Sequence, residues 1–336
     1  MSDFDDHSVE TLLREVGRRD APGAAMSGEV RQAVHAEWLA VVAQRRQRRR
    51  VMAYGIAASV AVAAIGLVVG LRFMSAASAS IATVTRVEGA LQVDRTHDGT
   101  WRSVTVGDRL TGGDLLRTGQ DARAALTLAS GVSVRMDAGS SIQLAATDRV
   151  VLDQGALYVD TRPVGAPTSG AAAEPVAAQS LVVETSYGSV RHLGTQYQVR
   201  TAQGAMEIGV REGRVEVMNT SGTHQGVAGE LLVIRSEGSV SRSAISAHDP
   251  SWHWVQRVAP PFDIDRQPLT DFLGWIERET GKQVVYATPQ VRQGAAQMIL
   301  RGSVDNLTPE QALAAVLATT SFRHTEDAGT IRIQQP

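Results

Sequence analysis

The sequence predicts a chain of mixed fold class: a short helical segment, one membrane-spanning helix, a large all-β domain and a small α+β domain. Three observations lead to this prediction. An uncharged run, residues 51–71, directly follows a cluster of arginines. Short segments of alternating apolar and polar residues, separated by glycines, fill residues 81–247. From residue 261 to residue 336, patterns typical of helices and of strands occur together.

Residues 51–71 have the length and composition of a single transmembrane helix. At the rise of an α-helix this run extends about 32 Å, close to the thickness of the hydrocarbon core of a bilayer. Arginine clusters stay on the cytoplasmic side of a membrane. We therefore expect residues 1–50 inside and the larger C-terminal part outside. A signal peptide is the alternative, although its charged region is usually much shorter than 50 residues. The arginines that set this orientation are Arg45, Arg46, Arg48, Arg49 and Arg50.

Two amphipathic helices are predicted before the membrane span. The first has its apolar stripe at residues 9–16 and the second at residues 30–42. Two such short helices bury little surface against each other, so part of their apolar faces is available for a partner. The alternative is a helical hairpin that only anchors the span. The residues predicted to bind a partner are Leu12, Leu13, Val34 and Trp38.

Residues 81–247 are predicted to form an antiparallel β-domain. Leu126 and Leu128 alternate with polar residues, and Ser130 and Gly131 then turn the chain into another alternating segment at 132–136. Such patterns occur in sandwiches, barrels and β-helices, and all three remain open here. Residues 163–179 are rich in Pro, Ala, Gly and Ser, which predicts a loop between two strands.

Several short motifs in this β-domain, taken in order, resemble the FecR family. They lie at 118–119 (TG), 132–136 (VSVRM), 149–159 (RVVLDQGALYV), 183–185 (VET), 190–199 (VRHLGTQYQV), 210–217 (VREGRVEV) and 228–230 (AGE). The chain departs from the family pattern at the 130–132 turn and in the length of the 163–179 loop.

The resemblance implies a single-span inner-membrane regulator of an extracytoplasmic-function (ECF) sigma factor. Residues 1–50 would bind the sigma factor in the cytoplasm. The periplasmic part would receive a signal from a TonB-dependent outer-membrane transducer, and membrane proteases would release the sigma factor. No cofactor is implied.

Residues 261–336 are predicted to form a compact α+β module. Strands are expected at 262–264, 284–286 and 298–302, and a helix is expected to end at Gly281. Thr308, Pro309 and Gln311 form the start signal of a second helix, and a hairpin ends the chain. The module resembles the short N-terminal (STN-like) signalling module of secretins and TonB-dependent transducers. Its edge strands can accept a partner strand, or the module can simply cap the β-domain.

The composition argues against several other classes of protein. The net charge of −2 and the scattered basic residues do not indicate a nucleic-acid-binding face, and the absence of cysteine excludes disulfides and thiolate chemistry. His248 and His253 flank Trp252 but have no third ligand nearby, so no metal site is predicted. No acid, base or nucleophile constellation indicates an enzyme that acts on an external substrate.

One site of chemistry is predicted, at the bond between Gly194 and Thr195. Several FecR-like regulators break a Gly-Thr bond at this place by themselves. Glycine permits a strained backbone, and the threonine hydroxyl can attack the preceding carbonyl. His192 is not assigned as the base, because residues three apart on a strand face opposite sides. The alternative is an ordinary turn.

The favoured function is therefore a transmembrane anti-sigma factor. An envelope scaffold that binds cell-wall polymer or a secretin-like assembly is the alternative from another class. The scaffold requires no sigma factor and tolerates loss of residues 1–40. An enzyme is the third possibility.

Overall fold

The computed structural model describes residues 80–162, 180–194 and 196–335. All of them belong to the second of two compact units, residues 78–336. The predicted partner-binding helices, the arginine cluster, the run 51–71, the loop 163–179 and Thr195 lie outside the described residues. Within the three described ranges, no helix is both long and apolar enough to cross a membrane.

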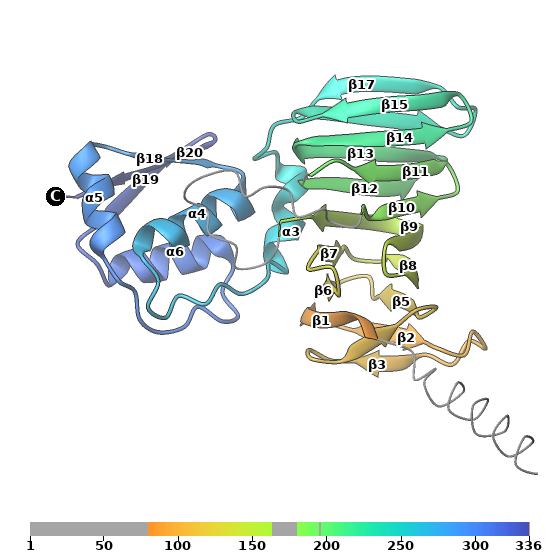
Figure 1. The fold of residues 1–336 in the computed structure, drawn as a ribbon, viewed down its shortest axis with the longest axis horizontal. Helices are drawn as coiled ribbons and strands as arrows, with labels where there is room; N and C mark the ends of the chain where they lie inside the picture. Colours follow the sequence, from red (N-terminus) through yellow and green to blue (C-terminus); the bar gives the residue numbers. More distant parts are fainter. Residues whose placement is uncertain (1–79, 163–179, 195, 336) are drawn as a thin grey trace, which may run out of the picture. The chain divides into compact units, whose positions relative to one another are not determined.

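Within the described ranges, seventeen strands form the β-domain and pair into two sheets that share one strand, β9. Figure 1 shows the strands stacked along the domain, from β3 at one end to β17 at the other. Sheet A contains β4 (Arg109–Thr111), β1 (Ser80–Glu88), β6 (Arg123–Leu128), β7 (Ser133–Met136), β9 (Arg149–Asp160), β12 (Gln196–Ala202), β13 (Ala205–Glu212), β16 (Glu230–Arg235) and β17 (Val240–Ala244), in spatial order. Sheet B contains β3 (Arg102–Val104), β2 (Leu91–Asp94), β5 (Leu115–Thr118), β8 (Ser141–Ala146), β9, β10 (Val182–Thr185), β11 (Gly188–His192), β14 (Arg214–Asn219) and β15 (Gly222–Val227).

The shared strand β9 bends from one sheet into the other at Gly155. Residues 149–154 pair with β8 in sheet B, and residues 155–160 pair with β12 in sheet A. Gly155 has a φ of +90°, and a Cβ there would lie 2.4 Å from the Ser140 hydroxyl oxygen. Only glycine fits this corner without displacing its neighbour. The glycine within 149–159 therefore bends one strand instead of ending it.

The core lies between the two sheets, so the domain is a sandwich. Leu126 and Val199 of sheet A and Leu144 and Val150 of sheet B are fully buried in one apolar cluster. The strand pairs are antiparallel, as expected, except that β9 and β10 run parallel. The parallel pair requires a long connection, and residues 161–181 supply it.

The C-terminal module has three helices on one side of a three-stranded sheet (Figure 1). Its elements are α4 (Leu269–Thr280), β18 (Gln283–Tyr286), α5 (Pro289–Gln297), α6 (Pro309–Ala318), β19 (Arg323–Asp327) and β20 (Thr330–Gln334). The spatial order of the strands is β18, β20, β19. Phe272, Leu273 and Ile276 of α4 are completely buried in the core of the module.

The predicted start of α6 and the predicted end of α4 are both confirmed. Thr308 and Gln311 form a reciprocal capping box at the start of α6, with Pro309 at its first turn. Gly281 ends α4 in the left-handed conformation, with a φ of +70°.

Two of the predicted strands are wrong, and one helix was not predicted. Residues 262–264 are irregular, and the segment 298–302 contributes only an isolated bridge between Pro268 and Ile299. Helix α5 precedes that segment; its N-cap is Thr288, which accepts a hydrogen bond from the Val291 N–H. Only Val291 and Ala295 of this helix are buried, so its apolar stripe is too sparse to stand out in the sequence.

A short connector joins the β-domain to the module. It comprises the 3-10 turn η1 (Pro250–Trp252) and the helix α3 (His253–Arg257). Trp252, Trp254 and Val255 pack with Ala156 and Tyr158 of β9 in a separate buried cluster. The predicted packing of both indoles is confirmed, and neither flanking histidine is brought into a group of metal-binding residues anywhere in the described ranges.

Candidate functional site

The junction between the β-domain and the C-terminal module is built on a buried ion pair. Arg135 of β7 donates from Nη1 to Oε2 of Glu279 at 2.7 Å and from Nη2 to Oε1 at 3.0 Å. Arg135 is 1% exposed and Glu279 is 4% exposed. Burial opposes the charge on Arg135, but the charge and hydrogen bonds of Glu279 outweigh it and raise the pKa of Arg135. Arg135 is thus held in its charged form.

A second arginine caps the end of helix α4. The Nη1 group of Arg211, on β13, donates to the Glu279 carbonyl at 3.1 Å, and its Nε donates to the Ala247 carbonyl at 2.7 Å. A cation at a helix C-terminus interacts favourably with the helix dipole and with the carbonyls that have no partner within the helix. The β-domain thus supplies part of the C-cap of a helix in the module.

Gly281 is required for this close approach. A Cβ at this position would lie 2.0 Å from the Ala247 carbonyl oxygen and 2.4 Å from Nη2 of Arg211. Any larger residue would push the module away from Ala247 and from Arg211 of β13.

A third arginine of the junction, Arg278, pairs with Asp160 at the end of β9. Its Nε donates to Oδ2 of Asp160 at 2.8 Å, and its Nη2 contacts the other carboxylate oxygen. The amide of Gln196 also donates to Oδ2 of Asp160, at 2.9 Å. The side chain of Asp160 is 3% exposed and that of Arg278 is 10% exposed, so this pair is also largely shielded from solvent.

Aromatic rings surround the charged groups on the connector side. The guanidinium of Arg135 lies 5.2 Å from the centre of the Tyr158 ring, and that of Arg211 lies 5.7 Å from the Trp252 ring. Burial raises the pKa of Tyr158 to about 12. Its hydroxyl therefore stays protonated, and Tyr158 adds no negative charge to the junction.

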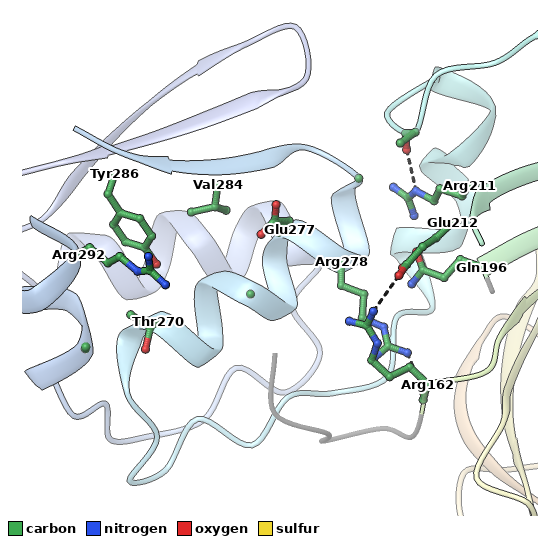
Figure 2. Close-up of a pocket in the computed structure, with 14 residues that line it drawn as sticks. Arg162, Gln196, Arg211, Glu212, Thr270, Glu277, Arg278, Val284, Tyr286 and Arg292 are labelled. Carbon is green, nitrogen blue, oxygen red and sulfur yellow. Dashed lines mark hydrogen bonds and ion pairs between the residues drawn. The ribbon is translucent and has the colours of Figure 1, made fainter. Parts of the chain in front are cut away.

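A groove of about 780 Å³ opens beside these contacts. Figure 2 shows Arg278, Arg162 and Glu212 toward the β-domain and Thr270, Glu277, Val284, Tyr286 and Arg292 on the module. Arg162 and Glu212 form an exposed ion pair at 2.9 Å. The groove has the volume of a peptide or ligand site, and six of its fourteen lining residues carry charged side chains.

At the predicted cleavage site, Gly194 is exposed and has a φ of +77°. Its neighbour His192, on β11, is buried, and its Nε2 accepts a hydrogen bond from the Leu181 N–H at 2.9 Å. Because a neutral imidazole that accepts at Nε2 carries its proton on Nδ1, Nδ1 cannot accept a second bond. The Gly194 nitrogen lies 3.4 Å from Nδ1, at the long end of the hydrogen-bond range. Burial lowers the pKa of His192.

The sequence did not reveal the charged junction. Arg135 and Arg211 lie within motifs on alternating strands, where a charged residue usually faces solvent, and Glu279 lies in a helix with many polar neighbours. One signal was available: Gly281 followed the predicted helix, and a glycine in that position permits close contact as well as a turn.

Comparisons with known proteins identify the central part of the β-domain. Residues 114–216 match the family described as FecR protein. This match covers less than half of the chain. Comparison with curated proteins gives no match.

Among solved structures, two crystal structures of a candidate anti-sigma factor from Parabacteroides distasonis ATCC 8503 are similar to this chain. They are 19% and 18% identical to it, with TM-scores of 0.34 and 0.33. Each similarity covers 66% of this chain and 99% or 98% of the other. A cell surface anchoring domain is also similar, with 22% identity and a TM-score of 0.18, over 19% of this chain and 84% of that domain.

Proposed function

We propose that this chain is a single-span inner-membrane anti-sigma factor that relays a periplasmic signal to an ECF sigma factor. The observation that carries the proposal is a FecR family domain preceded by an arginine cluster and an uncharged run of membrane-spanning length. Because arginine clusters stay on the cytoplasmic side of a membrane, we expect residues 1–50 in the cytoplasm and the FecR domain in the periplasm.

Residues 1–50 hold the sigma factor through the apolar stripes that include Leu12, Leu13, Val34 and Trp38. A single helix transmits small rigid-body movements poorly. Proteolysis within or beside residues 51–71 is the simplest way to turn an external event into release of the sigma factor inside. The external event is contact with a TonB-dependent outer-membrane transducer through the C-terminal module.

Co-purification of the full-length chain from membranes tests sigma-factor binding. The wild-type chain is expected to retain an ECF sigma factor, and Trp38→Ala is expected to lose most of it, because aromatic anchors dominate such interfaces. Trp101→Ala is the matched control. Trp101 lies in the β-domain, where Arg117 stacks on its ring at 4.0 Å, so its loss leaves the cytoplasmic segment unchanged. Equal retention by both variants would refute this mode of binding.

The relay also requires a particular topology. Reporter fusions after residue 50 and after residue 336 are expected to lie on opposite sides of the membrane. A pulse-chase during induction is expected to show loss of the full-length chain. Fusions on the same side, or a full-length chain that persists through induction, would contradict the relay.

We further propose self-cleavage between Gly194 and Thr195. The Thr195 hydroxyl oxygen attacks the Gly194 carbonyl carbon, the C–N bond breaks, and the freed amine takes up the proton. Water then hydrolyses the ester, leaving a carboxylate on Gly194 and restoring the hydroxyl. Two features favour the site: Gly194 is exposed in a left-handed conformation, and β11 and β12 on either side pair with other strands that would hold the fragments together.

A further inference from the structure

The free edge of strand β18 presents main-chain groups to the groove. The N–H groups of Gln283 and Ala287 donate to the carbonyls of Gly329 and Ile333, each at 2.8 Å. Because successive residues of a strand alternate their main-chain direction, Val284 and Tyr286 turn their N–H and C=O groups away from β20. No other strand of the described ranges pairs with that edge.

The opposite edge of the same sheet is protected. Strand β19 carries Arg323, His324, Glu326 and Asp327, and charged side chains discourage pairing with another strand. Strand β18 has only one polar residue, Gln283, followed by two valines and a tyrosine. Of the two edges, β18 is therefore the one suited to accept an added strand.

The shape of the groove fits an extended chain next to β18. Val284 and Tyr286 form one wall, and helix α4 contributes Thr270 and Gly274. In Figure 2, Val284, Tyr286, Thr270 and Arg292 surround the same open space. Gly274 and Ala296 are small, so they leave room for the alternate side chains of a bound strand.

Two charged groups in the groove indicate which side chain such a strand carries. Arg292 is exposed and forms no ion pair with any described residue, whereas Arg278 and Arg162 each have an acidic partner. The carboxylate of Glu277 lies close to the Val284 N–H at this edge. A bound strand would replace Glu277 at this N–H, and an acidic side chain on it would pair with Arg292.

We propose that the free edge of β18 is the docking site for an extended strand of a periplasmic partner protein. The strand is held by main-chain hydrogen bonds to Val284 and Tyr286 and carries an acidic side chain that binds Arg292. This inference rests on the proposed function in one respect: the proposed function places the module in the periplasm, where the partner protein is expected. Main-chain bonds provide the affinity, and Arg292 provides the specificity.

Synthetic peptides and the purified full-length chain in detergent test this proposal. The probe is a short peptide of alternating threonine and valine with a central aspartate. In two further peptides the main-chain nitrogens of alternate residues are methylated, along one edge of the extended peptide in the first and along the opposite edge in the second. A further peptide has a lysine in place of the central aspartate. Because an added strand uses only one of its edges, one methylated peptide is expected to lose about tenfold or more in affinity, equivalent to ~1.4 kcal/mol, and the other to bind as before.

Variants of the chain supply the second half of the test. Arg292→Glu is expected to reverse the preference, so that the lysine peptide binds more tightly than the aspartate peptide. Tyr286→Pro removes an outward N–H without removing a bond to β20, and it is expected to abolish binding. Tyr286→Val, which also loses the ring but keeps the N–H, is the control and is expected to retain binding.

Three results would each overturn the docking site: no binding of the aspartate peptide, equal binding of both methylated peptides, or an unchanged preference in Arg292→Glu. Far-ultraviolet circular dichroism shows that each variant is folded. None of these measurements depends on the binding of a sigma factor to residues 1–50. Failure of the docking site is therefore distinguishable from failure of the proposed function.

Discussion

Arg135 and Glu279 form a two-pronged, buried ion pair although 144 positions separate them in the chain. Arg135 belongs to the β-domain and Glu279 to helix α4 of the C-terminal module. The pair is held in place by further bonds, because Arg135 also donates to the Val255 carbonyl of the connector at 3.0 Å. The two parts are thus joined by charges that have no access to water.

The first prediction concerns this pair. Glu279→Ala is expected to destabilise residues 78–336 by about 3–5 kcal/mol, because it leaves the buried charge of Arg135 without a partner. The double variant Arg135→Met with Glu279→Leu is expected to recover most of that loss, because it removes both charges and keeps the volume. Chemical denaturation of the three proteins measures the difference. A double variant as unstable as Glu279→Ala would show that the pair itself stabilises the junction.

The second prediction concerns Gly281. Gly281→Ala introduces a Cβ that meets the Ala247 carbonyl and Arg211, in a left-handed conformation. The expected loss of stability is about 1–2 kcal/mol for the backbone plus about 1–3 kcal/mol for the crowding. Gly204→Ala is the matched control, because Gly204 has a φ of +80° and nothing within 4 Å of its added Cβ. Equal losses in thermal unfolding would show that the contact with the β-domain does not limit this position.

The sequence predicts those elements whose signals are local. Alternating apolar residues in the segment 126–136 predict strands, and the alternating side chains of Leu126, Val134 and Met136 lie in the apolar core between the two sheets. Thr308 and Gln311 predict the start of α6 because the capping box is complete within four residues. These signals require no knowledge of the rest of the chain.

The features that the sequence does not predict depend on contacts between residues that are far apart in the chain. The bend in strand β9 is not visible in the sequence, because a glycine within an alternating segment resembles a turn until the neighbouring Ser140 is known. Arg135 and Glu279 resemble surface residues in the sequence, because nothing in the local pattern around either residue shows that the two form a buried pair. The edge of β18 becomes visible only when the spatial order of the three strands is known.

The third prediction follows from the proposed self-cleavage. Purified full-length protein is expected to contain two fragments that separate after denaturation, and mass spectrometry is expected to place the new ends at Gly194 and Thr195. Thr195→Ala removes the hydroxyl and is expected to give one intact species. Thr195→Ser keeps a hydroxyl and is expected to cleave. A single intact wild-type species, unchanged by Thr195→Ala, would dispose of the proposal.

The fourth prediction concerns His192 and acid pH. Burial lowers the pKa of this imidazole below its ordinary value of about 6.5, so the folded protein holds His192 neutral while the unfolded chain takes up a proton. The stability that the neutral ring contributes is complete above about pH 6.5 and declines as the pH falls through the folded-state pKa. Chemical denaturation of residues 78–336 at several pH values between about 5 and 7 measures this decline.

His192→Gln isolates the contribution, because its side-chain oxygen can accept the Leu181 N–H but does not titrate in this range. The variant is expected to be less sensitive to acid than the wild type between these pH values. His253→Gln, which replaces an exposed histidine on α3, is expected to follow the wild-type profile. If His192→Gln and the wild type lose the same stability on acidification, the buried imidazole is not the group that responds. The acid sensitivity would then arise from other groups in residues 78–336.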